Sequence, residues 1–166
     1  LGLSFWTALD LYEGPVKKLN FLDKIPIIFI SLTIIAGTFV SGMDAGLVYN
    51  SFPYMGKTIV PIEYGSLGII DPFENPVSAQ FHHRLLATLT LVIIILYFIN
   101  YIRKNTINSR IIILFLAILC QFIIGIFTLL YSVPIVLGVI HQFGGVLLFL
   151  SSLWLLHLPK FKYNSN

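Results

Sequence analysis

Charged residues are scarce in this chain, and cysteine is almost absent. Of its 166 residues only 10% are charged, 57% are hydrophobic, and the mean hydropathy is +0.92. Soluble domains carry about 25% charged residues, so the composition excludes an ordinary soluble domain and indicates a membrane protein. The net charge of +3 is too small to indicate a nucleic-acid partner. Cys120 is the only cysteine, which excludes an internal disulfide and a cysteine-based metal cage.

Long apolar runs, by contrast, are abundant. A membrane-spanning helix needs roughly 20 mostly apolar residues, and four runs reach this length. They lack the alternating polarity of barrel strands, so they predict an all-α membrane protein with a four-transmembrane-helix bundle over residues 25–158. The four predicted spans cover residues 25–43, 80–102, 110–131 and 135–158.

The placement of Lys and Arg predicts the orientation of the bundle. The connection over residues 44–79 has one Lys against four acidic residues, and the turn at residues 132–134 carries no charge. By the positive-inside rule, both termini lie on the cytoplasmic or matrix side and the long connection faces outward. The cations elsewhere flank the other ends of the spans: Lys17, Lys18, Lys24, Arg103, Lys104, Arg110, Lys160 and Lys162.

The segments outside the spans have distinct expected roles. A connection of about 36 residues is longer than most, and we expect it to form a lid at the membrane surface with a short helix. Residues 1–24 are expected on the cytoplasmic side, where LGLSFWTALDLY is typical of the end of a preceding helix. No signal peptide is visible at the N-terminus, which we interpret as a processed edge or the product of a split gene. Residues 159–166 are expected to form a cytoplasmic tail.

Three of the four histidines fall near the outward ends of two spans. His82 and His83 lie in the first turns of the second span, and His141 lies about six residues into the fourth, roughly 9 Å deep. His83 and His141 are therefore expected at the same depth on two helices of one bundle. His157 lies 16 residues beyond His141, roughly 24 Å further along the axis, and is not expected to share their site.

Small residues accompany these histidines. On a helix, positions three or four residues away share a face, so glycines near the histidines leave either room for a flat ligand or a surface for close helix contact. Gln121, Gly125 and Thr128 form a similar small and polar stripe on the third span. The other small residues are Gly37, Gly42 and Gly46 on the first span, Ala87 on the second, and Gly138, Gly144 and Gly145 on the fourth.

Two imidazoles facing each other across such a gap suit the axial positions of a haem iron. Zinc is less favoured because it needs a third or fourth ligand, and only Asp44 and the loop acids are near. Arg84 is predicted either to pair with a haem propionate or to extend to lipid phosphate. His82 and His157 are more typical of interfacial side chains bonded to a carbonyl or water.

Three stretches together resemble a known family. SGMDAGLVYNSFPYMG, FENPVSAQFHHRLLA and CQFIIGIFTLLYSVPIVLGVIHQFGGVLL follow the order and spacing of haem A synthase of the mitochondrial and alphaproteobacterial type. The resemblance extends over about residues 35–157. It implies an enzyme of eight transmembrane helices in two four-helix halves, which oxidises the C8 methyl group of haem O to the formyl group of haem A for cytochrome c oxidase.

The resemblance also implies roles for residues and partners. His83 and His141 correspond to the pair that holds haem b in the C-terminal half, with Arg84 beside them. The N-terminal half, with the haem O site and an acidic catalytic residue, has no counterpart here, so no catalytic residue is assigned. We expect that half to be supplied as a separate chain, or the chain to form a homo-oligomer in membrane lipid. Asp44, Asn50 and Gln142 are candidate groups around the cofactor.

Two other functions remain open from the sequence. The chain would serve equally as a non-catalytic membrane b-type cytochrome, passing electrons to a quinone or a partner protein. A small transporter or a purely structural bundle would bind no chromophore. In each case the expected location is the bacterial cell inner membrane, or the mitochondrial inner membrane, as a multi-pass protein.

Overall fold

The computed structural model describes residues 1–14, 16 and 19–157, and this part of the chain contains helices and no strand. The cations Lys17, Lys18, Lys160 and Lys162 and the predicted tail at residues 159–166 lie outside the described residues. The orientation in the membrane therefore stays a prediction. The elements are α1 (Gly2–Glu13), α2 (Phe21–Gly42), η1 (Ala45–Leu47), η2 (Gly68–Ile70), α3 (Asp71–Glu74), α4 (Pro76–Lys104), α5 (Ser109–Leu130) and α6 (Ile135–Leu156).

Four of these helices, α2, α4, α5 and α6, are long and apolar enough to span a membrane. They confirm the predicted fold class, although two begin four residues before the predicted spans. The Asn20 amide donates to the carboxylate of Asp23 at 3.1 Å, which starts α2 at Phe21. The side chain of Asn75 accepts from the Val77 amide at 3.0 Å, which starts α4 with Pro76 in its first turn. Polar caps therefore extend both helices beyond their apolar runs.

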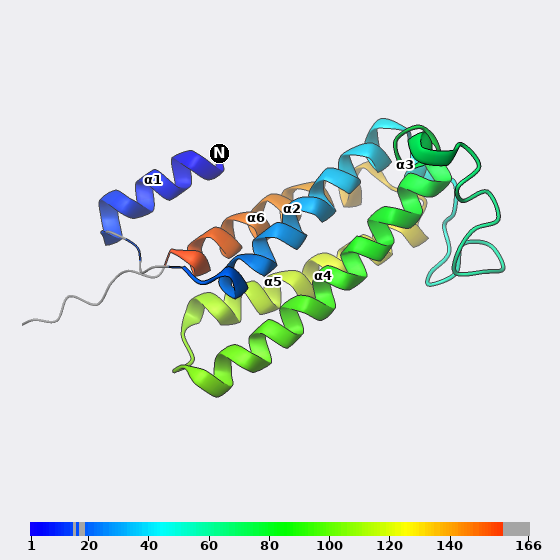
Figure 1. Ribbon diagram of the computed structural model, residues 1–166. Coiled ribbons are helices and arrows are strands. Elements are labelled where there is room, and N and C mark those ends of the chain that lie inside the picture. Colours follow the sequence, from blue (N-terminus) through cyan, green and yellow to red (C-terminus); the bar gives the residue numbers. More distant parts are fainter. Residues whose placement is uncertain (15, 17–18, 158–166) are drawn as a thin grey trace, which may run out of the picture.

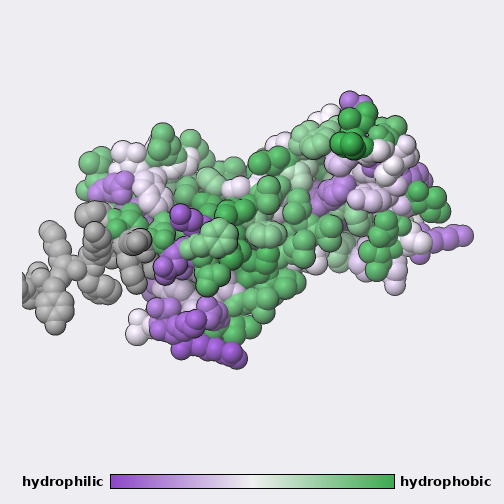
Figure 2. All heavy atoms as spheres, in the orientation of Figure 1, coloured by the Kyte–Doolittle hydropathy of each residue, from purple (hydrophilic) through white to green (hydrophobic). Residues whose placement is uncertain are grey.

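The four long helices form two pairs, α2 with α4 and α5 with α6, which pack side by side into one bundle (Figure 1). We call the end that carries the long connection the loop end, and the opposite end the α1 end. Apolar side chains form the core between the pairs, and apolar surface covers the middle of the molecule while polar residues gather at both ends (Figure 2). The core residues are Ile30, Ile94, Ile111, Leu114, Ile118, Leu148 and Leu155.

The connection between α2 and α4 is a folded cap at the loop end, with the short helix α3 that the sequence predicted. Asp71 is its centre, because its carboxylate accepts from the amides of Gly65 and Leu67, both at 2.9 Å. Burial raises the pKa of Asp71, but hydrogen bonds from Ser78, Asn75 and the two amides outweigh this effect. They hold the pKa well below its usual range, so the cap is built on an ionised carboxylate.

Candidate functional site

The structure brings His83 of α4 and His141 of α6 together between the two helix pairs. Their ring centroids lie 6.4 Å apart, and the ring planes are nearly perpendicular at 87°. In the described part of the chain, no hydrogen bond uses the Nε2 atom of either ring. The separation of the two rings is thus large enough for one ion to fit between them.

Helix α2 positions the ring of His83 at two points. The Nδ1 atom lies 3.1 Å from the main-chain carbonyl oxygen of Thr33. One turn later, Gly37 lies against the ring, where a Cβ atom would come within 3.1 Å of Cε1. Glycine at position 37 therefore lets the imidazole approach α2 closely, and a larger residue there would require the ring to shift.

Helix α5 positions His141 with the same spacing. The Nε2 atom of Gln121 lies 3.2 Å from Nδ1 of His141 and 2.7 Å from its main-chain carbonyl oxygen. One turn later, a Cβ atom on Gly125 would lie 2.8 Å from Cε1 of the ring. On α6, the absence of a side chain at Gly144 leaves space for Gln121, because a Cβ atom there would lie only 2.2 Å from Oε1 of Gln121. The helices α5 and α6 therefore interlock through two side chains, each resting on a glycine of the other.

A cavity of about 820 Å³ opens beside the two histidines. Its size lies within the range of cofactor pockets, roughly 300–1,000 Å³. All four long helices line it, and Ile118 and Leu148 of the apolar core close it toward the α1 end. The predicted small residues have two functions here. Gly37, Gly125 and Gly144 make room for the side chains of His83, His141 and Gln121, whereas Gly138 and Gly145 border the cavity.

Arg84 lies at the loop end of the cavity and binds the long connection. Its two terminal nitrogens donate to the carbonyl oxygens of Ser51 at 2.8 Å and Tyr49 at 2.7 Å. Gln80, one turn earlier, donates to the same Tyr49 oxygen at 3.0 Å. The Nε atom of Arg84 and the Oε1 atom of Gln80 are buried and have no partner in the described chain. Arg84 thus holds residues 49–51 over the cavity and keeps one free donor; pairing with a propionate stays a prediction.

The other candidate residues do not contact either imidazole. Asn50 ties η1 to α5 by donating to the carbonyl oxygens of Gly46 and Leu129. The amide of Gln142 is 3.5 Å from the hydroxyl of Ser41, and Asp44 begins η1 in the left-handed region with φ 50°. His82 contacts the hydroxyl of Tyr64 at 3.3 Å instead of the carbonyl group or water that the sequence predicted.

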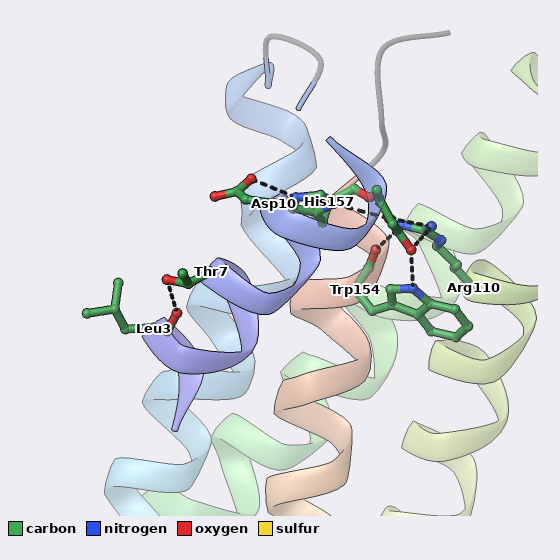
Figure 3. A network of polar contacts seen from close by, with 7 residues as sticks. Leu3, Thr7, Asp10, Arg110, Trp154 and His157 are labelled. Atoms are coloured by element: carbon green, nitrogen blue, oxygen red, sulfur yellow. Dashed lines mark hydrogen bonds and ion pairs between the residues drawn. The ribbon is translucent and has the colours of Figure 1, made fainter. Parts of the chain in front are cut away.

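His157 belongs to a second polar cluster at the α1 end, far from the cavity. The prediction of an interfacial side chain bonded to a carbonyl or water is wrong for His157. The side chain is fully buried, and its Nε2 and Nδ1 atoms lie 2.8 Å from Asp10 and 3.2 Å from Glu13 of α1. Arg110 of α5 donates to both Glu13 oxygens at 2.8 Å and to the main-chain carbonyl oxygens of Trp154 and His157 (Figure 3). This cluster fastens α1 to the ends of α5 and α6.

Two features of these sites were not predicted from the sequence. Gln121 was recognised as part of a polar stripe, but its contact with His141 depends on how α5 faces α6. The polar cluster around His157 joins this residue to Glu13 and Asp10, which are 144 and 147 positions away in the chain. Its only local signal is the spacing of Asp10 and Glu13, which places both acids on one face of α1.

Comparison with known proteins gives a consistent result. A family model described as cytochrome oxidase assembly protein, COX15-CtaA, matches residues 1–153. The protein named heme A synthase of Pelagibacter ubique is 39% identical over 94% of this chain and 48% of its own length. For the heme A synthase of Granulibacter bethesdensis the values are 37%, 92% and 42%, and for human heme A synthase COX15 they are 37%, 93% and 41%. The chain thus spans about half the length of these relatives. No solved structure matches it.

Proposed function

Because the chain belongs to the cytochrome oxidase assembly protein family, we propose that it is the haem b-holding half of a haem A synthase. It is a multi-pass membrane protein, and its family fits a bacterial or mitochondrial inner membrane. The substrate of the whole enzyme would be haem O, oxidised at a methyl group to give haem A. The substrate site would lie in the half of the relatives that this chain does not span.

One observation carries the proposal, namely the histidine pair beside the cavity. Metal–nitrogen bonds of roughly 2 Å on both sides of one ion hold two imidazole centroids roughly 6 Å apart, close to the 6.4 Å between His83 and His141. In the described residues no third His, Cys or acid joins them to form a metal cluster, which favours a haem iron over a bare ion. A haem held by two imidazoles supplies one-electron transfer and has no open position for oxygen.

The residues around the pair would bind and shield this group. Thr33 orients the ring of His83 by accepting at Nδ1, as the hydrogen-bond partners of metal-bound histidines usually do, and Gln121 holds the ring of His141 by its contact with Nδ1. Arg84 would add its free Nε donor for a propionate at the loop end. The folded cap around Asp71 would cover this end of the cavity and limit the access of water.

A visible absorption spectrum of the detergent-purified chain, oxidised and dithionite-reduced, tests this proposal. We expect a low-spin b-type spectrum that is lost in His83→Ala and in His141→Ala. His82→Ala is the matched control, because it removes the neighbouring imidazole and should leave the spectrum unchanged. A colourless but folded protein, or full haem content in both variants, would show that the assignment is wrong.

The histidine pair beside the cavity suits one alternative as well, a non-catalytic b-type cytochrome with the same ligands. Co-expression with the N-terminal half of the Pelagibacter relative separates the two functions. Haem A that accumulates only when both chains are present supports the synthase. Haem O that stays unconverted beside a haem-loaded chain supports the cytochrome.

A further inference from the structure

We infer that Gln121 fixes the tautomer of His141, so that His83 and His141 carry their ring protons on opposite nitrogens. Gln121 is then a positioning residue that sets how His141 becomes a ligand. The tautomers follow from contacts within this chain alone, whereas their consequence for haem binding rests on the proposed function.

The tautomer of His83 follows from its partner. Its Nδ1 atom lies 3.1 Å from the main-chain carbonyl oxygen of Thr33, and a carbonyl oxygen only accepts hydrogen bonds. Nδ1 must therefore carry the proton and donate it. The Nε2 atom of His83 then keeps a free lone pair, which is the form that binds a metal.

The tautomer of His141 follows from the orientation of the Gln121 amide. The nitrogen of this amide lies 2.7 Å from the main-chain carbonyl oxygen of His141, and an amide oxygen at that place would meet another oxygen. The NH₂ group must therefore face α6. Its second hydrogen points to Nδ1 of His141 at 3.2 Å, so Nδ1 accepts and the ring proton lies on Nε2.

The position of the amide is restricted, and its oxygen has no partner. The side chain of Gln121 fills the notch over Gly144 and lies 3.6 Å from the Cβ position of Gly145. Its Oε1 atom is buried and accepts no hydrogen bond in the described chain. A buried acceptor without a donor is unfavourable, so this oxygen is available to accept a hydrogen bond.

The free oxygen is the acceptor that a ligated His141 needs. Ligation through Nε2 requires the ring proton to leave Nε2 and to be carried on Nδ1, with no net change in proton number. Nδ1 would then need an acceptor, and Oε1 of Gln121 would provide one only if the amide also gave up its contact with the main-chain carbonyl oxygen of His141. In its tautomer His83 would hold the iron directly, whereas His141 would first need this change at Gln121.

The first experiment needs no haem. We would measure the ¹⁵N shifts of the histidine ring nitrogens in the haem-free chain in micelles, in mildly alkaline buffer where the rings are neutral. We expect protonated Nδ1 for His83 and protonated Nε2 for His141. Gln121→Glu presents only acceptors and should move the His141 proton to Nδ1, while His83 stays unchanged. Cys120→Met, on the exposed neighbouring position, should change neither ring.

The second experiment uses the haem-loaded chain. A carboxylate that accepts from Nδ1–H makes the imidazole a stronger donor to the oxidised iron, so the midpoint potential should fall in Gln121→Glu. It should rise in Gln121→Met, which accepts only weakly, and stay the same in Cys120→Met. If the Gln121→Met variant binds no haem, the fall of the midpoint potential in Gln121→Glu is sufficient to test the inference.

The outcomes separate this inference from the proposed function. Identical tautomers for His83 and His141 in the wild-type chain, or an unchanged His141 in Gln121→Glu, overturn the inference whatever the haem content. Opposite tautomers in a chain that never binds haem support the role of Gln121 and contradict the proposed function. Equal midpoint potentials in wild type and Gln121→Glu overturn the link between Gln121 and ligation.

Discussion

Replacing Arg110 by Met should release α1 from the bundle. Arg110 and Glu13 form an ion pair at 2.8 Å with side chains only 15% and 14% exposed, and the guanidinium also lies 5.0 Å from the ring centroid of Trp154. Removing one partner of a buried pair costs about 3–5 kcal/mol. Glu13 keeps contacts to Trp154 and His157, which places the loss near the lower end, about 3 kcal/mol.

Hydrogen exchange of the α1 amides measures this loss directly, because α1 opens without unfolding the four long helices. About 3 kcal/mol corresponds to roughly 100-fold faster exchange, since 1.4 kcal/mol is a factor of ten. The control is Arg103→Met, which removes an exposed cation at the same end of the bundle. If exchange in Arg110→Met rises less than tenfold, or no more than in the control, the cluster does not hold α1.

The same cluster predicts a pH dependence. Burial of Glu13 raises its pKa, but hydrogen bonds from Arg110, Trp154 and His157 outweigh this and lower the pKa below its usual value. Because its pKa is lowered, ionised Glu13 stabilises the docked state at pH values above the usual pKa of a glutamate. This stabilisation is lost as the pH falls through the lowered pKa. The protection factors of the α1 amides, which compare the observed exchange with the intrinsic rate at each pH, should therefore fall in acid, and the fall should be weaker in Glu13→Gln.

Three further changes test the loop end. Asp71→Asn should speed hydrogen exchange at the Gly65 and Leu67 amides, which the carboxylate binds. Because the pKa of Asp71 is lowered, the wild-type cap should stay ordered until the pH falls below the usual pKa range of an aspartate. Arg84→Met should increase proteolysis of the connection, and Arg84→Lys should rescue it only in part, because lysine lacks the fork that reaches two carbonyl groups. Gly125→Ala should destabilise the bundle by about 1–3 kcal/mol, measured by thermal unfolding in micelles, whereas Gly42→Ala, with open space around it, should not.

The helices of this protein are predictable because the spans are defined by composition. Long apolar runs need no tertiary information to be recognised, and the depth of His83 and His141 follows from counting residues along two helices. The ends of the helices were less predictable, since Asn20 and Asn75 extend α2 and α4 through polar caps. Hydropathy does not report such caps, because they act on single backbone groups.

The rotation of each helix about its axis was not predictable from the sequence. It decides that Gln121 faces His141 rather than lipid, and that Gly144 accommodates Gln121 rather than a ligand. Arg84 shows the same limit. Its charge and depth indicated an anionic partner, whereas its terminal nitrogens bind carbonyl groups of a connection more than 30 residues away in the chain.

The two helix pairs position their histidines by the same arrangement of contacts. In α2 and in α5, the group that contacts Nδ1 comes one turn before the glycine under the ring: Thr33 before Gly37, and Gln121 before Gly125. Each imidazole is therefore fixed to its own pair, and only the packing between the pairs sets the distance between the rings. The apolar core around Ile118 makes that contact, directly beside the cavity. Because the core joins the pairs at the α1 end and the cavity separates them toward the loop end, a flat ligand would enter between the pairs and leave each histidine in place.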